Sequence, residues 1–231
     1  MTVYSLIWTV AFLVIAFPTH AKENISKQVQ DLVKRVDARY AQTQDFQADF
    51  VQETIIEGFD TPLRSSGRVY IKKPGQLRWD FLEPSLEKIY VHGDQLEMYV
   101  PEHHQIVKGS LTRMVATKAP LRLLQGAGKL EEHFDVGPTG NGETGAGGLP
   151  LLTLIPKQQG GQPSASPISR IVSEIQPKTY FIQTVRLYEV SGNLSIYRFE
   201  HLKANTGLDD KIFTLVPPDG VVVVEDVLPS P

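Results

Sequence analysis

The sequence predicts a mainly β protein with a few helices (α+β), built on one strongly curved antiparallel sheet of about ten strands. Residues 46–108 contain successive short runs that alternate apolar and polar side chains and that turns separate, a pattern typical of antiparallel strands with one apolar face. Similar runs return between residues 168 and 202. An amphipathic helix predicted at residues 24–40 precedes the strands, and we expect helices to cover the concave side of the sheet.

The start of the chain has the composition of a secretory signal peptide. Residues 2–21 contain no Asp, Glu, Lys or Arg, are mostly apolar, and end with the small side chain of Ala21 at the expected cleavage position. An uncleaved membrane anchor is the alternative, although the apolar run is short for a span. We therefore expect a signal peptide at residues 1–21 and one exported domain at residues 22–231.

The composition argues against several classes of function. The 231 residues carry a formal net charge of −3, so we expect no nucleic-acid partner. The chain has no cysteine, which excludes disulfides, thiolate metal sites and a cysteine nucleophile. The same absence excludes attachment of a lipid to an N-terminal cysteine.

The strongest strand signal is the hairpin at residues 66–81. Its two strands alternate apolar and polar side chains on either side of Pro74 and Gly75, which favour a tight turn. A strand at residues 46–56 precedes the hairpin, and residues 88–100 repeat the pattern around a second turn. These strands are predicted to form an antiparallel meander with one continuous apolar face.

The second half of the chain adds short helices, loops and further strands. Residues 110–125 are predicted to form two short helices that Pro120 separates. Gly-rich and polar loops are expected at residues 137–148 and 158–167, as mobile insertions at an edge of the sheet. Further strand signals lie at residues 134–136, 151–155, 168–175, 180–190 and 194–202, and residues 212–216 and 221–224 flank a last turn.

No motif makes a positive case for an enzyme. Residues 140–145 match G-x-G-x-x-G, but the glycines and proline that follow cannot begin the helix that a dinucleotide site needs. His103 and His104 are adjacent, so in a strand they point to opposite faces and cannot share one metal. No G-x-S-x-G occurs. We expect no catalytic residues, no metal and no cofactor.

Several segments together resemble one known family. They are residues 46–52 (FQADFVQ), Gly67, residues 72–79 (KKPGQLRW), 89–101, 152–157 and 213–220 (FTLVPPDG). In this order they closely resemble the LolA family of periplasmic lipoprotein carriers. The resemblance implies an unclosed β-barrel, or half-barrel, whose concave apolar face is covered by a lid of helices.

The resemblance implies a carrier and not a catalyst. Members of this family receive lipoproteins from the inner-membrane ABC transporter LolCDE, shield their acyl chains and pass them to the receptor LolB at the outer membrane. LolB has the same fold but is anchored through an N-terminal cysteine, which this chain lacks. The resemblance therefore implies a soluble periplasmic carrier, and we expect it to be a monomer.

The predicted site residues lie on one face of the meander and on the two short helices. The predicted acyl-chain cavity consists of Phe50, Leu77, Trp79, Phe81, Ile89, Val91, Leu96 and Met98, and the predicted lid of Met114, Leu121 and Leu124. Each could instead be ordinary core, because core and ligand would use one face. Lys73 stands where the family commonly has arginine and is expected to contact the lid; a solvated charge is the alternative.

Two other classes of function remain as alternatives. One is a periplasmic lipoprotein-sensing or lipid-binding regulatory module with the same half-barrel, which acts by partner contact without transport. Such proteins often have an additional domain, and about 210 residues after the expected cleavage site leave no room for a sizeable one. The other is a periplasmic hydrolase, which the lack of a catalytic constellation disfavours.

Overall fold

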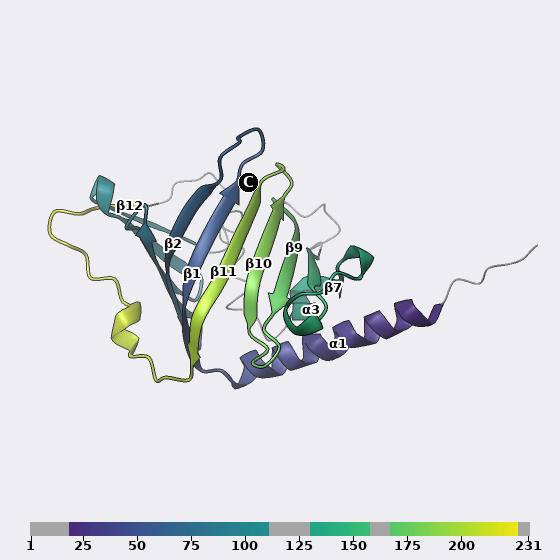
Figure 1. Ribbon diagram of the computed structural model, residues 1–231. Helices are drawn as coiled ribbons and strands as arrows, with labels where there is room; N and C mark the ends of the chain where they lie inside the picture. Colours follow the sequence, from purple (N-terminus) through teal and green to yellow (C-terminus); the bar gives the residue numbers. More distant parts are fainter. Residues whose placement is uncertain (1–18, 111–129, 158–166, 226–231) are drawn as a thin grey trace, which may run out of the picture.

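The computed structural model describes residues 19–110, 130–157 and 167–225, and one sheet dominates this part of the chain (Figure 1). The sheet has twelve strands in the order β12-β6-β5-β4-β3-β2-β1-β11-β10-β9-β8-β7. The strands are β1 (Asp45–Ile55), β2 (Leu63–Lys72), β3 (Gln76–Glu83), β4 (Lys88–His92), β5 (Gln95–Val100), β6 (Gln105–Ser110), β7 (Phe134–Pro138), β8 (Leu152–Pro156), β9 (Ile168–Ile175), β10 (Ile182–Glu189), β11 (Leu194–Ala204) and β12 (Val222–Glu225).

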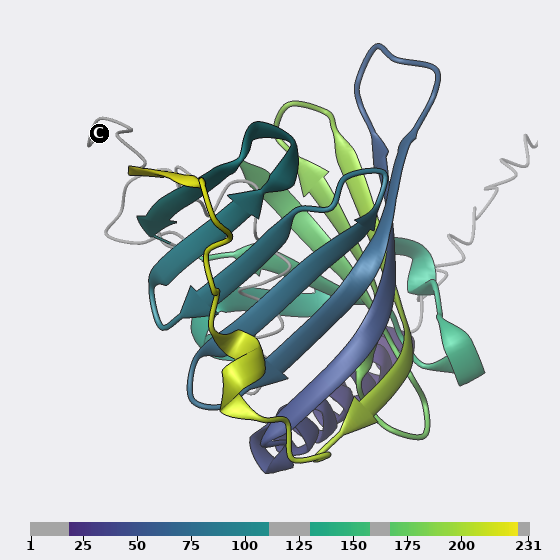
Figure 2. The same ribbon diagram turned by 90° about the vertical axis from the view of Figure 1, so that its left-hand side faces the viewer.

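The sheet is strongly curved and unclosed, which confirms the predicted fold class (Figure 2). Neighbouring strands are antiparallel except for β12, which pairs with β6 in parallel. Strands β12 and β7 end the sheet at opposite edges and do not pair with each other, so the barrel stays open. The centre of the sheet is formed by β1, which pairs with both β2 and β11 and so joins the two halves of the chain.

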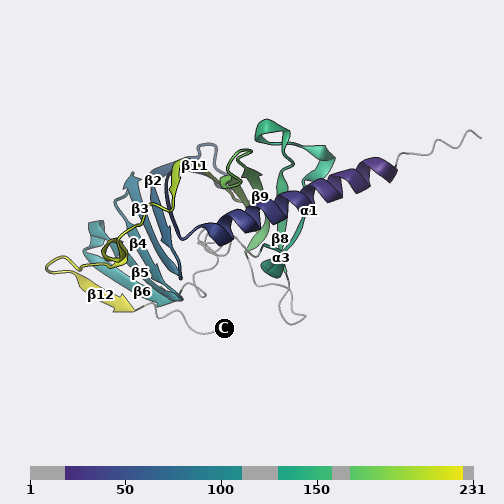
Figure 3. The same cartoon turned by 90° about the horizontal axis from the view of Figure 1, so that it is seen from below.

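Helix α1 (Thr19–Gln42) confirms the predicted helix and extends it at both ends. Its apolar stripe follows the three- and four-residue spacing of one helix face and is buried in the main core; the buried residues are Val29, Leu32, Val33, Val36 and Tyr40. The helix runs across one end of the sheet and contacts β7 (Figures 1 and 3). No helix in the described part of the chain is long and apolar enough to cross a membrane.

The remaining helical elements are short. They are α3 (Leu130–His133) and the 3-10 turns η1 (Pro101–His103), η2 (Gly140–Gly142), η3 (Ala146–Gly148) and η4 (Asp210–Phe213). The two short helices predicted within residues 110–125 lie outside the described residues except for Ser110, which ends β6. The same holds for residues 158–166 of the second predicted loop.

Gly137 and Pro138 of the first predicted loop are the last residues of edge strand β7, and the rest of that loop lies at the sheet edge as expected. It folds back on the sheet, because the backbone N–H of Ala146 donates to Glu174 Oε1 at 2.9 Å. Gly145 permits this approach, since a Cβ there would lie 2.8 Å from Glu174 Cγ and 2.9 Å from Leu151 Cδ2. The G-x-G-x-x-G match therefore lies in a loop with short 3-10 turns.

The segment at residues 212–216 differs from the strand-like pattern of its sequence. Its first residues belong to η4, whose N-cap residue Asp209 accepts a hydrogen bond from the backbone N–H of Lys211. Phe213, in this turn, is fully buried, and η4 packs against β3. The start of this segment therefore forms a turn and not a strand, because the turn buries the ring of Phe213 on the outer face of the sheet.

Candidate functional site

The inward faces of the strands form one continuous apolar surface. Alternation places every second residue of β1 to β5 on this face, and the pairing registers bring these residues into lateral rows. All eight residues predicted for the cavity join one hydrophobic cluster: Phe50, Leu77, Trp79, Phe81, Ile89, Val91, Leu96 and Met98. Six of the eight are fully buried, and Phe81 and Met98 are only partly buried.

Five rings meet on this face and form what we call the aromatic cluster, which consists of Phe50, Trp79, Phe81, Tyr197 and Phe199. The centroids of Phe50 and Trp79 are 4.4 Å apart. Trp79 also meets Tyr197 edge-on at 5.9 Å, and Phe50 meets Phe81 edge-on at 5.4 Å. These are favourable geometries for aromatic pairs. The cluster gives the concave face a continuous apolar floor.

Gly67 makes room for the aromatic cluster. It pairs with Phe50 on one side and Phe81 on the other. A Cβ at this position would lie 2.0 Å from the backbone oxygen of Asp80 and 2.8 Å from two ring carbons of Phe50. The ring of Phe50 therefore lies over the space that a side chain at residue 67 would need.

The second half of the sheet contributes residues that were not among the predicted site residues. They are Leu152 and Leu154 on β8, Ile171 and Ile175 on β9, Val185 and Leu187 on β10, and Tyr197 and Phe199 on β11. Their strands were predicted, and the period-two alternation within each strand indicates an apolar face. What the sequence does not show is that pairing of β1 with β11 brings this face next to Trp79.

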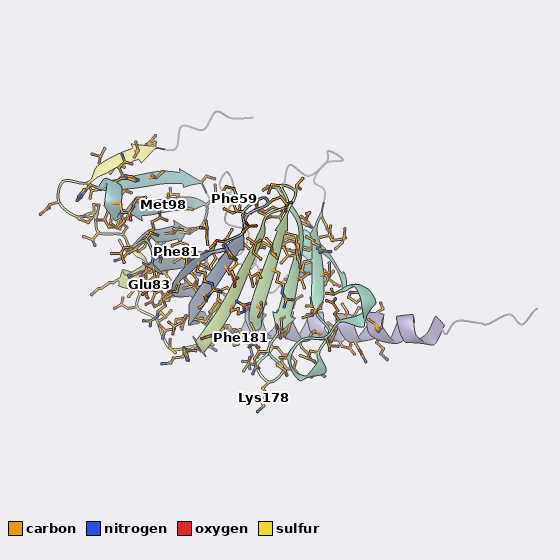
Figure 4. All side chains as sticks on the ribbon, turned by 45° about the horizontal axis from the view of Figure 1, so that its top comes forward. Phe59, Phe81, Glu83, Met98, Lys178 and Phe181 are labelled. Carbon is orange, nitrogen blue, oxygen red and sulfur yellow. The ribbon has the colours of Figure 1, made fainter. Side chains whose placement is uncertain are left out.

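Figure 4 shows how the two partly buried residues are placed. Phe81 and Met98 lie on the β2–β6 half of the sheet, and Phe181 lies at the other end, where β10 begins near α1. Phe181 packs edge-on against Tyr40 at 5.3 Å between ring centroids. The α1 end of the apolar face is thus filled by aromatic side chains of the protein itself.

A small polar group lies among the inward residues of β1 and β11. Gln52 Nε2 donates to Thr54 Oγ1 at 3.1 Å, and Thr54 Oγ1 lies 3.2 Å from Ser195 Oγ. Burial, followed by the negative charge of Glu189, raises the pKa of the Tyr197 hydroxyl well above its usual value, so this group stays neutral.

Lys73 joins the turn between β2 and β3 to the end of α1. Its Nζ donates to the carbonyl oxygen of Tyr40 at 2.5 Å and lies 3.3 Å from that of Ala41. These carbonyls belong to the last turn of the helix, where the regular donors four residues on run out, and that of Tyr40 also accepts from the backbone N–H of Thr43 at 3.2 Å. The predicted lid residues Met114, Leu121 and Leu124 lie outside the described residues, so the contact between Lys73 and the lid stays a prediction.

The outer face of the same strands holds a partly buried charged pair, in which Asp80 is buried and Arg78 is partly exposed. Arg78 donates to both carboxylate oxygens of Asp80, at 2.7 Å for the shortest contact, and its guanidinium lies over the rings of Tyr70 and Tyr90. The hydrogen bonds to Asp80 raise the pKa of the guanidinium. Arg78 Nη1 also donates to the carbonyl oxygen of Ile212 at 3.0 Å. The pair thereby fixes η4 on the outer face of the sheet. Figure 2 shows η4 lying across the strands on this face.

The arrangement suits binding better than chemistry. Among the described residues, no group of three or more His, Asp or Glu side chains could hold a metal ion. The side chains of the apolar concave face offer contact area and few polar groups. Such a surface can hold an extended apolar ligand by burial alone.

Comparison with known proteins points to one family. The family model described as outer membrane lipoprotein carrier protein LolA matches residues 41–216. A protein of Methylococcus capsulatus named outer-membrane lipoprotein carrier protein is 28% identical over 180 residues, covering 78% of this chain and 81% of that protein. A protein of the same name from Dechloromonas aromatica is 25% identical over 207 residues, covering 90% of each chain.

A solved structure supports the fold independently. The crystal structure of an uncharacterized conserved protein from Thermus thermophilus matches with a TM-score of 0.54 and 16% sequence identity. The match covers 85% of this chain and 98% of that one. At this identity the likeness concerns the fold alone.

Proposed function

This chain belongs to the LolA family of outer membrane lipoprotein carrier proteins, and on that premise we propose that it carries lipoproteins across the periplasm. In this proposal residues 1–21 are a signal peptide and residues 22–231 form the carrier domain. The carrier accepts a lipoprotein from the inner-membrane transporter LolCDE, shields its acyl chains on the concave face, and delivers it to the receptor LolB. Members of this family bind and transport, so we propose no catalytic step.

The observation that carries the proposal is the apolar concave face of an unclosed sheet. An acyl chain of ~15 methylenes gains on the order of 12 kcal/mol when it leaves water, so it crosses an aqueous space slowly unless a protein shields it. The aromatic cluster and the aliphatic rows beside it supply that environment. Because the sheet is open between β7 and β12, a ligand chain can enter along its length without threading through a closed barrel.

Phe81 and Met98 are the residues that we propose to meet the ligand first. Both pack against the core and yet keep part of their surface accessible. The six buried residues of the predicted cavity would then form the floor beneath the acyl chains. A methionine at such a surface adapts to chains of different shape, because its thioether side chain is flexible and polarisable.

We further propose that Met114, Leu121 and Leu124 form the lid over this face. A large apolar surface left open would promote aggregation, so the empty carrier needs a cover. Handover to LolB then requires that opening the lid costs little more free energy than ligand binding returns. Lys73 would act at the edge of this lid while it holds the end of α1.

The test measures transfer of a lipoprotein from membranes to the carrier in solution, and compares the wild-type protein with variants of the concave face. The protein is incubated with membranes that contain LolCDE and a triacylated lipoprotein, with ATP, and the soluble fraction is analysed by native mass spectrometry. We expect a one-to-one complex of carrier and lipoprotein. Phe81→Glu should abolish the complex, since it places a charge on the concave face.

Leu82→Glu is the matched control, because Leu82 is the next residue in β3 and is 52% exposed. It should leave the complex intact, and circular dichroism should show that both variants fold. Lipoprotein that stays in the membrane, while a known carrier releases it from the same membranes, would reject transport and favour the regulatory lipid-binding module.

A further inference from the structure

Two buried polar atoms lie on the apolar concave face without a hydrogen-bond partner. In the part of the chain that the structure describes, Trp79 Nε1, Ser173 Oγ and Gln76 Oε1 are the buried side-chain polar atoms that lack one. Gln76 alternates with Leu77 and so faces outward. Trp79 and Ser173 face the core and are 2% and 1% exposed, respectively. Buried polar groups are paired in most proteins, so each exception needs a reason.

The indole N–H of Trp79 lies within the aromatic cluster. The ring meets Phe50, Phe81, Tyr197 and Phe199 at centroid distances between 4.4 and 6.3 Å. A phenylalanine at residue 79 would make ring contacts of the same kind and would bring no hydrogen-bond donor that needs a partner. Indole nitrogen can only donate a hydrogen bond, so the missing partner must be an acceptor.

Ser173 is a hydroxyl within an aliphatic patch. On β9 it lies between Ile171 and Ile175, and its cross-strand partners are Val185 on β10 and Leu152 on β8. All four neighbours belong to the main hydrophobic core. A bound water would need two or more polar partners, which these aliphatic neighbours do not offer.

Ser195 shows that a buried serine on this face can be paired. It lies on β11 with 7% of its surface exposed, and its hydroxyl lies 3.2 Å from Thr54 Oγ1. The hydroxyl of Ser173 is therefore not unpaired merely because it lies on the concave face.

We propose that Trp79 Nε1 and Ser173 Oγ donate hydrogen bonds to carbonyl oxygens of ester- or amide-linked acyl chains. This inference rests on the proposed function and adds polar recognition to it. An acyl chain is apolar except at its linkage, where a carbonyl oxygen accepts but cannot donate. Burying that oxygen without a donor is unfavourable, as is burying the two donors without an acceptor. In the bound state the carbonyl oxygens and the two donors are all hydrogen-bonded.

The inference separates ligand recognition from stability. In the free protein the Ser173 hydroxyl is desolvated and unpaired, so Ser173→Ala should raise the melting temperature. In the ligand complex the same substitution removes a donor. Ser195→Ala is the matched control, because it removes a paired hydroxyl and should lower the melting temperature without changing ligand preference.

The first experiment measures binding of two synthetic lipopeptides to the full chain. One carries two ester-linked acyl chains, and the other carries ether-linked chains of equal length. We expect wild-type protein to prefer the ester by about tenfold, from the order of free energy that one or two hydrogen bonds contribute. Ser173→Ala and Trp79→Phe should each reduce this preference several-fold, and Ser195→Ala should retain it.

The second experiment observes the indole directly. The chain has two tryptophans, Trp8 and Trp79, so a Trp8→Phe variant of the full chain labelled with 15N-tryptophan gives one indole resonance. The ester lipopeptide should move its Hε1 proton downfield, and the ether analogue should not. This readout does not depend on a variant at Trp79.

Equal affinity for the ester and the ether, or an Hε1 shift that is the same with both, would overturn this inference and leave acyl-chain shielding intact. Failure of both lipopeptides to bind would reject the proposed function together with the inference. The two failures are thus distinguishable in one set of measurements.

Discussion

Lys73 Nζ donates to the carbonyl oxygen of Tyr40 at 2.5 Å, and this contact ties the turn between β2 and β3 to the end of α1. Tyr40 is fixed at the same time by its own ring, which packs edge-on against Phe46 and Phe181. Its hydroxyl oxygen accepts from the backbone N–H of Ile182 at 3.3 Å. One helical residue therefore links both halves of the sheet, and Lys73 completes the link.

Lys73→Met should loosen the last turn of α1. It removes the positive charge and the donor from carbonyls at the negative end of the helix dipole, so we expect a loss of about 1 kcal/mol of unfolding free energy. Hydrogen exchange near residues 36–43 should also become faster, and transfer of lipoprotein to LolB should slow. Lys73→Arg keeps a charged donor and serves as the control. Unchanged exchange and unchanged transfer in the methionine variant would contradict the role of Lys73.

Gly67→Ala should destabilise the protein strongly. The new Cβ would meet the backbone oxygen of Asp80 and the ring of Phe50, and the backbone cannot move aside as a flexible side chain could. We expect a loss of about 2–4 kcal/mol, measured by urea unfolding, with reduced lipoprotein binding because the aromatic cluster shifts. Gly137→Ala is the control, since a Cβ at that position meets nothing within 4 Å. Equal stability of the two variants would show that the sheet accommodates the added methyl group.

The inner face of the first five strands is predictable because strand alternation has a period of two. Phe50, Trp79 and Ile89 were all placed on one surface by that rule, and the turn at Pro74 and Gly75 fixed which strands pair. The rule predicts which residues of a strand share one face. It does not predict which strands, when they are far apart in sequence, lie side by side.

The features that were not predicted depend on tertiary contacts. Tyr197 reaches Trp79 only because β11 pairs with β1, and the carbonyl of Tyr40 is 33 residues from Lys73 in the chain. The lack of a partner for Ser173 is likewise a property of its neighbours and not of its residue type. Residues 212–216 were predicted as a strand, but Ile212 and Phe213 belong to the turn η4, and Phe213 is fully buried.

Asp45 should make stability depend on acidic pH. Its carboxylate accepts from Thr206 N, Thr206 Oγ1 and Gly207 N at 2.8–3.1 Å. Burial raises the pKa of this carboxyl, but the hydrogen bonds outweigh burial and hold the pKa below its usual value. The folded state therefore binds the proton less tightly than the unfolded state. The resulting stabilisation is present above the unfolded pKa of about 4 and is lost as the pH falls through the folded pKa.

Asp45→Asn should remove this part of the acid dependence. Unfolding free energies measured from pH 7 down to about pH 2 should fall less steeply in the variant than in the wild type, and the variant should be less stable at pH 7. Asp219→Asn, at an exposed turn, is the control and should keep the wild-type slope. Parallel curves for wild type and Asp45→Asn would assign the acid sensitivity to other groups.

Arg78→Lys should release the C-terminal segment from the outer face. Lysine keeps the charge, but it cannot reproduce the forked contact with Asp80 together with the bond to the Ile212 carbonyl. We expect a loss of about 1–3 kcal/mol and faster hydrogen exchange across residues 205–225, because η4 loses its anchor. Exchange in α1 should stay unchanged, since Arg78 lies on the opposite face of the sheet from the main core.

Arg198→Lys is the control for this substitution. Arg198 is 48% exposed and lies 3.8 Å from Glu53, so it makes a weak surface ion pair that lysine can replace. The control should leave stability and exchange at wild-type values. If Arg78→Lys behaved the same way, the pair of Arg78 and Asp80 would not hold the segment, and the anchor would have to be Phe213 together with the pair of Lys72 and Asp210. Combining Arg78→Lys with Phe213→Ala separates these contributions, because coupled contacts give a non-additive loss.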